Sequence, residues 1–562
     1  MPPRFAIAFD RGAHRHALLE NAGRASLEVR ANLSDVLLLA SEETPARIGR
    51  RAVLVGELFD EEPGPPAASD ADALPFDPAA MAKRNWGHFV ACGIAEDGRP
   101  AVYRDPSGAV PIFQHERASG DIFISDAGLA KALGLLGAPK IDRQFVIHWL
   151  QFPFLRTART GLENVREILP GVCRSKSGEE WHDEPVWSPG SFIGRADAIL
   201  DAGGAAAQLR SLALATVPRQ VREPVLLQLS GGLDSSILAA CLNAAGIAFT
   251  GINFATRSAD GNEQRFARTV ARATGADLIE LAEEELQALP LPAVRSFRPG
   301  TNPLLAPIET AVGHCAERIG AHLVNGGGGD NLFCSVSSAA PVMDALCRAG
   351  PRAAARTVDD IAARAGCTWW DVLKAATRRT ARRRPRWKED RSLMNRDVLL
   401  PAPEPHPWLD LPSGTLPGKR EHVESLVHIQ HFLDRTLNPD RQALHPLMAR
   451  PLLELCLRIP SWLWLRGGRD RAVARDAFQG LLPDLILERR TKGSLQSLFD
   501  RSFQRLSGEI RDCLLGGELR RLGIIDLGAV EQAFATAAHD ELVQMRLTEM
   551  TALELWLQSW RG

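Results

Sequence analysis

The stretch that decides the fold is Leu226-Leu-Gln-Leu-Ser-Gly-Gly-Leu-Asp-Ser-Ser-Ile-Leu238. An apolar strand runs directly into a loop of small residues, and a helix follows. Glycine permits close backbone approach, and the free N–H groups at a helix start favour anionic oxygens. The loop lacks the Gly-Lys-Ser/Thr ending of a Walker A loop. It therefore predicts a different phosphate-binding turn, formed by Ser230, Gly231, Gly232, Asp234, Ser235 and Ser236.

The carboxylate of Asp234 lies inside this predicted phosphate loop. A carboxylate repels a phosphate unless a cation lies between them, and Mg²⁺ prefers oxygen ligands. We therefore expect Asp234 to hold Mg²⁺.

The pattern along the chain changes near residue 200. Before about residue 185, short apolar runs are separated by turn signals, which predicts strands at 53–59, 88–94, 101–104, 112–115 and 121–125. After 200, predicted strands at 225–229, 249–254 and 322–325 alternate with predicted helices at 235–245, 262–274 and 308–319. This alternation indicates a parallel sheet covered on both faces.

Two domains follow from that change. Pro185-Val-Trp-Ser-Pro-Gly190 has the composition of a linker, and the chain beyond about 340 is mainly helical in pattern, with a Pro-rich break at 400–407. We expect one domain at 1–190 and a second at 191–562.

Composition excludes several classes of protein. The formal net charge is −2, so a general nucleic-acid or membrane-surface binder is not expected. The nine cysteines are scattered and form no Cys-x-x-Cys pair, which argues against a disulfide framework or a zinc site and fits a reducing cytoplasm. No signal-peptide pattern or apolar stretch long enough to span a membrane is present.

Ser230 to Ser236 resembles the pyrophosphate loop of the asparagine synthetase superfamily, whose members cleave ATP between the α and β phosphates. A second motif of that family, glycine-rich and ending in Asp, is matched by Asn325-Gly-Gly-Gly-Gly-Asp330. The resemblance implies ATP and Mg²⁺ as cofactors, with Asp234 and Asp330 as metal ligands. It also implies that Lys492, in Arg489-Arg-Thr-Lys-Gly493, contacts the phosphates and the acyl-adenylate oxygens.

Four further residues are assigned to the nucleotide site. Asn253 and Phe254 end the predicted strand at 249–254, where they are expected to line the adenine. Asn325 and Gly326 open the second motif and are expected to bind ATP or pyrophosphate.

The N-terminal half is also similar to this superfamily, in which it forms a glutaminase-like αββα sandwich of the Ntn-hydrolase type. The matching segments are Val53 to Phe59 and Tyr103-Arg-Asp-Pro-Ser-Gly-Ala-Val-Pro-Ile-Phe113. Glutamine-dependent members carry a nucleophilic Cys directly after the initiator Met, whereas residue 2 here is Pro. A proline carries no thiol, so no thioester can form. We therefore expect an inactive glutaminase-like domain and an amine supplied by the substrate.

Gly327 stands where asparagine-forming relatives carry Glu and β-lactam-forming relatives carry Tyr. The single tyrosine, Tyr103, lies in the other predicted domain, which excludes a tyrosine-based dyad. The glycines at 326–329 would leave an open floor for a bulky substrate or accommodate a tight backbone turn. These features are most similar to the lasso-peptide macrolactam synthetases within the superfamily.

That resemblance implies an ATP-dependent cyclase. It would adenylate an Asp or Glu side chain of a leaderless precursor peptide and close an isopeptide ring with the peptide's own N-terminal amine. A leader peptidase and a leader-recognition protein would be partners. Ammonia-dependent asparagine synthetases, small-molecule lactam synthetases and a catalytically dead scaffold remain alternatives.

Amine attack requires a proton acceptor. Glu424, His428 and His431 fall on one helical face by their spacing, and histidine accepts protons near neutral pH. They are the candidate general bases, although packed or solvated helix residues would show the same pattern.

Overall fold

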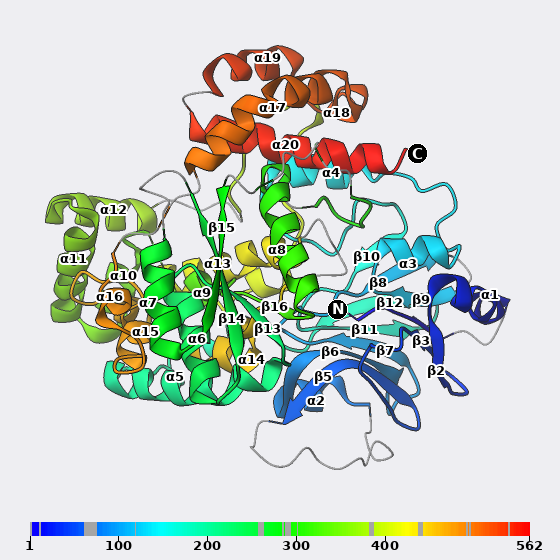
Figure 1. Cartoon of the computed structure of the whole chain (residues 1–562), viewed down its shortest axis with the longest axis horizontal. Helices are drawn as coiled ribbons and strands as arrows, with labels where there is room; N and C mark the ends of the chain where they lie inside the picture. Colours follow the sequence, from blue (N-terminus) through cyan, green and yellow to red (C-terminus); the bar gives the residue numbers. More distant parts are fainter. Residues whose placement is uncertain are drawn as a thin grey trace.

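The computed structural model describes residues 3–9, 13–60, 76–117, 120–256, 263–283, 286, 291, 294–300, 302–335, 337–381, 387–435, 442–490, 493, 496–537 and 540–561. Figure 1 shows the antiparallel strands of the N-terminal part beside a central parallel sheet, with a group of C-terminal helices across one end of both.

Two six-stranded antiparallel sheets form the N-terminal part. The first has the order β10-β8-β9-β1-β3-β2, with bounds β1 Phe5–Ala8, β2 Glu28–Asn32, β3 Leu37–Ala40, β8 Phe113–Arg117, β9 Gly120–Ile124 and β10 Val165–Glu167. The second has the order β12-β11-β7-β6-β5-β4, with bounds β4 Ala46–Ile48, β5 Ala52–Asp60, β6 Asn85–Ile94, β7 Pro100–Arg104, β11 Val172–Ser177 and β12 Glu180–Pro185.

Side-chain alternation explains how these sheets are layered. In β1, Phe5 and Ile7 belong to the core that also takes in Val53 and Val90 of the other sheet, while Ala6 and Ala8 face a core built with helices. Successive side chains of a strand point to opposite faces, so one strand serves both layers. The helices of this part are α1 Ala13–Ala22, α2 Pro78–Arg84, α3 Ala127–Ala132 and α4 Arg143–Gln151. The αββα arrangement is therefore confirmed.

A four-stranded parallel sheet of order β15-β14-β13-β16 forms the centre of the C-terminal part. Its strands are β13 Val225–Gln228, β14 Phe249–Ala255, β15 Asp277–Ala282 and β16 His322–Val324. In β13, Val225 and Leu227 face the core shared with α5 and α6, and Leu226 faces the core shared with α8. Both faces are covered, as the alternation of strands and helices predicts. The covering helices are α5 Ala202–Thr216, α6 Leu233–Ala244, α7 Gln264–Thr274 and α8 Ala306–Arg318.

Helices make up most of the remaining chain. Their bounds are α9 Gly329–Leu332, α10 Ala340–Ala349, α11 Pro351–Ala365, α12 Trp369–Ala381, α13 Pro417–Leu433, α14 Arg450–Arg458, α15 Ala472–Ala477, α16 Asp484–Leu487, α17 Gln496–Gly516, α18 Glu518–Arg521, α19 Leu527–Thr536 and α20 Glu541–Ser559. α20 and α17 share one apolar core with α4 and the first antiparallel sheet. The C-terminal helices α17 and α20 therefore pack against the N-terminal part of the molecule.

Eight of the sixteen described strands lie near predicted positions, namely β5 to β9, β13, β14 and β16, and the other eight were not predicted. One of those eight is β15. Its residues, Asp277-Leu-Ile-Glu-Leu-Ala282, form the edge of the parallel sheet, where charged side chains are tolerated, so the apolar run expected of a buried strand is missing. The domain boundary at 190 stays a prediction. Among the described residues, no helix is long and apolar enough to cross a membrane.

Candidate active site

The loop Ser230 to Ser236 connects β13 to α6. Gly231 has φ +66°, and a Cβ there would lie 2.4 Å from the Phe266 Cβ of α7, so only glycine fits. The Ser230 hydroxyl accepts a hydrogen bond from the Gly232 N–H at 3.1 Å, and the Ser236 hydroxyl donates one to the Gly232 carbonyl at 2.7 Å. No side chain of the described chain caps α6 at Gly232. The N–H groups of its first turn are therefore available to an anion.

Asp234 and Asp330 meet at one guanidinium group. β13 and β16 are adjacent parallel strands, so the segments after them emerge at the same sheet edge. Nη1 of Arg471 donates to Asp234 Oδ1 at 3.2 Å and also forms an ion pair with Asp330. Burial opposes the charge of Arg471, but the carboxylates of Asp234, Asp330 and Asp470 outweigh it and raise the Arg471 pKa. The pairing of the two aspartates that the resemblance implied is present in the geometry.

These two carboxylates fit a magnesium ion. Both reach one positively charged atom, and the Asp330 side chain is 39% exposed, which leaves room for further ligands. Mg²⁺ is commonly held by one or two protein carboxylates together with water and substrate phosphates. Within the described residues, no group of three or more His, Cys, Asp or Glu side chains could hold a metal ion, so phosphate and water would complete the coordination.

Arg471 was not predicted as a site residue. It adopts a left-handed conformation, φ +49°, directly before α15. Asp234 and Asp330 lie 237 and 141 residues from it in sequence. The only available signal was its place in Gly467-Gly-Arg-Asp-Arg471, which shows neither partner.

The four glycines at 326–329 form a tight turn and not an open floor. A Cβ on Gly329 would lie 2.4 Å from the Asp234 carboxyl carbon, and one on Gly326 would lie 2.9 Å from the Ser235 nitrogen. A Cβ on Gly328 would lie 2.3 Å from the Met448 sulfur. The expectation of open space for a bulky substrate is wrong here, because the turn is packed against the phosphate loop.

His445 fills the space beside Gly327. Its Nδ1 lies 2.6 Å from where a Gly327 Cβ would be, and 2.6 Å from Asn325 Oδ1. Its Nε2 lies 2.8 Å from the Leu433 carbonyl oxygen. Asn325 Oδ1 also accepts from the Gly327 N–H at 2.8 Å. The Asn325 side chain therefore braces the turn, and its contact with nucleotide stays a prediction, as does that of Gly326.

Asn253 and Phe254 end β14 beside the loop. Asn253 Nδ2 donates to the Leu229 carbonyl at 2.9 Å, so it links two strand ends. Its Oδ1 is buried without a hydrogen-bond partner among the described residues. Phe254 packs against the core beneath α8. Their role at the adenine stays a prediction.

The candidate bases lie on α13, which packs against α9: the Asn331 side chain, next to Asp330, donates to the Ser425 carbonyl of α13 at 2.9 Å. The His431 ring is buried, with its centroid 4.5 Å from that of Trp149, and Arg435 Nη1 approaches its Nε2 at 2.5 Å. Burial, followed by Arg435, holds the His431 pKa well below its ordinary value. His428 packs on Phe154 at 4.6 Å, and burial followed by Lys388 lowers its pKa.

Both rings are therefore neutral near pH 7, but each is packed among aromatic rings. Glu424 is half-buried on the same helix. Their roles as bases stay predictions.

Lys492 and Pro2 lie outside the described residues. The flanks of Lys492 are described: Arg489 Nη1 donates to the Gly231 carbonyl at 3.1 Å, and Gly493 N–H donates to Glu263 Oε1 at 3.1 Å. Arg489 therefore contacts the phosphate loop directly, and it is a second basic residue that the sequence did not single out.

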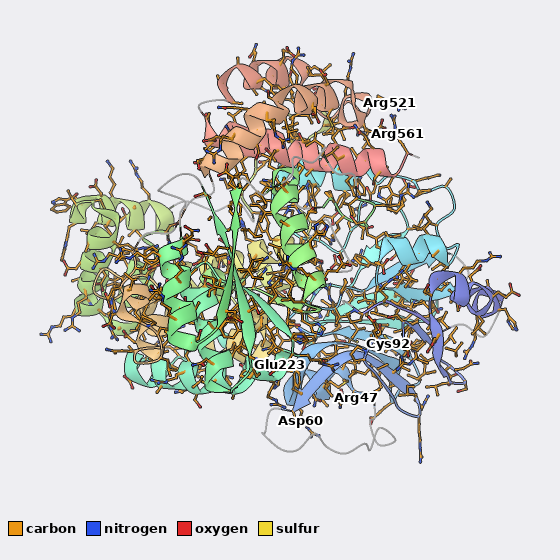
Figure 2. The ribbon with its side chains drawn as sticks, in the orientation of Figure 1. Arg47, Asp60, Cys92, Glu223, Arg521 and Arg561 are labelled. Atoms are coloured by element: carbon orange, nitrogen blue, oxygen red, sulfur yellow. The ribbon has the colours of Figure 1, made fainter. Side chains whose placement is uncertain are left out.

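Neither cysteine of the N-terminal part is suited to nucleophilic chemistry. Cys92 lies within the antiparallel strands and is fully buried (Figure 2). Burial raises its pKa well above the ordinary value and raises that of Cys173 to about 12. A thiol that stays protonated is a poor nucleophile.

A two-sheet antiparallel N-terminal part joined to a parallel sheet, with a carboxylate pair beside a glycine-rich turn at the ends of its strands, defines a two-part α/β protein. The family model for asparagine synthase matches residues 208–558, more than half of the chain. The chain belongs to the asparagine synthase family, which implies an ATP-dependent, AMP-forming carbon–nitrogen ligase.

No curated protein matches the chain. Two solved structures share 11% identity with it, each over 57% of this chain and with a TM-score of 0.21. One is a glutamine phosphoribosylpyrophosphate amidotransferase from B. subtilis complexed with ADP and GMP, of which 90% is covered. The other is described as the allosteric regulatory enzyme of purine biosynthesis, of which 88% is covered.

Proposed function

We propose that this protein is an ATP-dependent lasso-peptide macrolactam synthetase. It would adenylate an Asp or Glu side chain of a leaderless precursor peptide and join it to the peptide's N-terminal amine, releasing AMP and pyrophosphate. The observation that carries the ATP chemistry is the convergence of Asp234 and Asp330 on Arg471 beside an uncapped helix start. A leader peptidase and a leader-recognition protein would supply the peptide.

Two features support an amine on the substrate as the nucleophile. The thiols of Cys92 and Cys173 are buried and protonated, so neither offers a route to ammonia from glutamine. The only tyrosine, Tyr103, is fully buried in the N-terminal part and takes no part in a lactam-forming dyad near residue 327.

In the first half-reaction, a peptide carboxylate oxygen bonds to the α-phosphorus of ATP, and the bond to pyrophosphate breaks. Asp234 and Asp330 would hold Mg²⁺, which would supply positive charge to the phosphate oxygens. The first-turn N–H groups of α6 orient the phosphates, and Arg489, which contacts the Gly231 carbonyl, supplies positive charge at the loop.

In the second half-reaction, the peptide amine bonds to the activated carbonyl carbon and the bond to AMP breaks. The amine must lose a proton, and a neutral imidazole can accept it. His428 and His431 are both neutral at pH 7, and they remain the candidates on α13.

The decisive experiment incubates the protein with ATP, Mg²⁺ and a leaderless peptide that carries an acidic residue seven to nine positions from its N-terminus. Mass spectrometry should detect loss of one water, and pyrophosphate should appear in equal amount. Asp234→Asn should lower both by at least about 100-fold, because the metal loses a charged ligand. Asp97→Asn, on an exposed turn of the N-terminal part, is the matched control.

Undiminished pyrophosphate release by Asp234→Asn would refute the role of the loop. A free side-chain amide formed from ammonia, with no ring, would instead favour an asparagine-synthetase-like reaction.

A further inference from the structure

A cavity of about 300 Å³ lies between the N-terminal sheets and the C-terminal part. Its walls come from segments far apart in sequence: the start of β1, the end of β9, α4, the segment 295–300, and the end of α13. The lining includes none of the residues 230–236 or 325–330. The proposed function assigns a role to one lining residue, the candidate base His431, and gives none to the other lining residues.

The cavity is strongly basic. Five guanidinium groups line it, from Arg4, Arg156, Arg295, Arg298 and Arg435. The lining carboxylates are Asp126 and Asp434, and both are engaged. Asp126 accepts from the Leu129 N–H at the start of α3 at 2.8 Å, and Asp434 is paired with Arg156.

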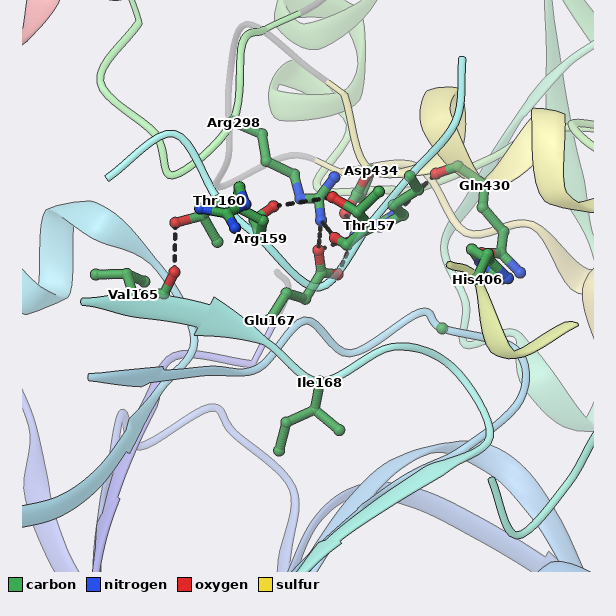
Figure 3. Close-up of polar contacts among 12 residues, drawn as sticks. Thr157, Arg159, Thr160, Val165, Glu167, Ile168, Arg298, His406, Gln430 and Asp434 are labelled. Carbon is green, nitrogen blue, oxygen red and sulfur yellow. Dashed lines mark hydrogen bonds and ion pairs between the residues drawn. The ribbon is translucent and has the colours of Figure 1, made fainter. Parts of the chain in front are cut away.

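Beneath the cavity floor, three arginines converge on one fully buried glutamate (Figure 3). Glu167 accepts from Arg104 at 2.6 Å and also pairs with Arg156 and Arg298. Burial alone would raise the Glu167 pKa, but the three arginines lower it to about 2. Burial, assisted by Arg156, lowers the pKa of Arg298 to about 10. Positive charge exceeds negative charge here, so an added anion would be favourable.

Two cavity-lining guanidinium groups keep donors without an acceptor. Arg298 Nε and Arg435 Nη2 are buried and have no hydrogen-bond partner among the described residues. The other nitrogens of Arg435 are engaged: Nε donates to the Gly300 carbonyl at 2.7 Å, and Nη1 contacts His431 Nε2 and pairs with Glu549 at 3.6 Å. The guanidinium group also lies 5.4 Å over the Trp149 ring. A buried charged donor left unpaired is costly, and an acceptor in the cavity would relieve that cost.

Apolar walls restrict the class of anion. Trp149, Phe113 and Phe297 line the cavity beside the arginines, and the two phenylalanine rings lie 4.7 Å apart. An inorganic anion has no apolar surface to pack against these rings. A carboxylate attached to an apolar group can pair with the arginines and pack against the rings at the same time. Arginine forks also match carboxylate geometry.

We propose that this cavity is a binding site for a carboxylate group on an apolar or aromatic frame, recognised by Arg298 and Arg435. Its natural occupant is an acidic group of the peptide substrate, held apart from the carboxylate that is activated. The assignment of the occupant to the peptide substrate rests on the proposed function. The binding of a carboxylate in the cavity does not.

The test measures binding of 3-phenylpropionate to the full chain by titration calorimetry, with the neutral 3-phenylpropionamide as the matched ligand. The acid should bind at least about tenfold more tightly than the amide. Arg435→Gln should lower the affinity for 3-phenylpropionate by at least about tenfold. Arg511→Gln, on α17 and paired with Glu531, should leave that affinity unchanged. Thermal unfolding checks that each variant is folded.

Should Arg435→Gln fail to fold, Arg295→Gln serves instead, since Arg295 donates to the Ser559 carbonyl and lies outside the Glu167 cluster. Equal binding of acid and amide, no binding of either, or unchanged binding in both variants would overturn the site. Competition by inorganic sulfate at equal strength would show a general anion pocket and overturn the carboxylate assignment.

A second arm separates this site from the proposed function. With a cyclised peptide, Arg295→Gln should raise KM for the peptide and leave KM for ATP unchanged. An unchanged peptide KM with intact probe binding in the wild type refutes only the peptide assignment. Absence of cyclisation with intact probe binding counts against the proposed function and not against the site.

Discussion

At the scale of single residues, the contact between Gly329 and Asp234 is a close steric constraint on the candidate site. Gly329→Ala would place a methyl group 2.4 Å from the Asp234 carboxyl carbon, so one of the two backbones must shift. We expect substrate-dependent pyrophosphate release to fall by at least about 100-fold, because a misplacement near 1 Å can cost that much.

The control for this change is Gly508→Ala in α17. A Cβ there meets nothing within 4 Å, so alanine should stabilise the helix by about 0.5–1 kcal/mol and leave activity unchanged. Equal activity of both variants would show that the turn does not position Asp234.

Arg471 gives a second prediction at this scale. In Arg471→Gln, Asp234 and Asp330 lose the positive charge between them, so their mutual repulsion is relieved only by another cation. Mg²⁺ should therefore raise the melting temperature of this variant by more than it raises that of the wild type, as measured by calorimetry with and without Mg²⁺. Adding Asp330→Asn should reduce the effect, and an equal Mg²⁺ shift in wild type and variant would show that Arg471 and the metal do not compete.

At the scale of elements, α20 joins the two parts of the molecule through Trp556. This ring is 1% exposed, its Nε1 donates to the Ser296 carbonyl at 2.6 Å, and it packs against Gly161, where a Cβ would lie 2.1 Å from the ring. Trp556→Ala should lower the free energy of unfolding by about 3–5 kcal/mol in urea titration. Trp370→Ala, with a ring 79% exposed on α12, should change it by less than about 0.5 kcal/mol. A similar loss of unfolding free energy in both variants would show that Trp556 of α20 does not stabilise the contact between the two parts.

At the scale of the whole molecule, buried neutral histidines set the response to acid. Burial lowers the pKa of His88 and His148 to about 4, and of His406 and His422 to about 3, from an ordinary value of 6.5. Between pH 6.5 and about 4, the unfolded chain binds protons at these sites and the folded chain does not. Stability should therefore fall as pH falls through this window, by about 1.4 kcal/mol per pH unit for each histidine.

Asp105 opposes this trend, since burial raises its pKa to about 7 and the folded chain then binds a proton that the unfolded chain lacks. Burial also raises the pKa of Asp344, Asp360 and Glu554, and it lowers the pKa of four further histidines, His322, His428, His431 and His445. The histidines therefore outnumber the carboxyl groups that oppose them. Urea unfolding at pH 7.5, 6 and 5 measures the sum, and a stability that rises toward pH 5 would contradict the burial of neutral rings.

The sequence by itself determined the local parts of this protein. The Ser230–Ser236 loop follows an apolar strand and opens a helix within a few residues, so its fold depends on short-range periodicity and glycine placement. The second motif, ending in Asp330, and eight of the sixteen described strands could be predicted for the same reason. β15 was not predicted because an edge strand need not be apolar.

Only the tertiary structure decided which distant groups meet. The same four glycines could have lined a cavity or packed a turn, and the packing of Asp234 and Met448 against them settled that choice. Arg471, far from both aspartates in sequence, and the arginines around Glu167 carry no local pattern. Their positions follow from long-range packing and from electrostatic interactions that act between side chains in space and leave no periodicity in the sequence.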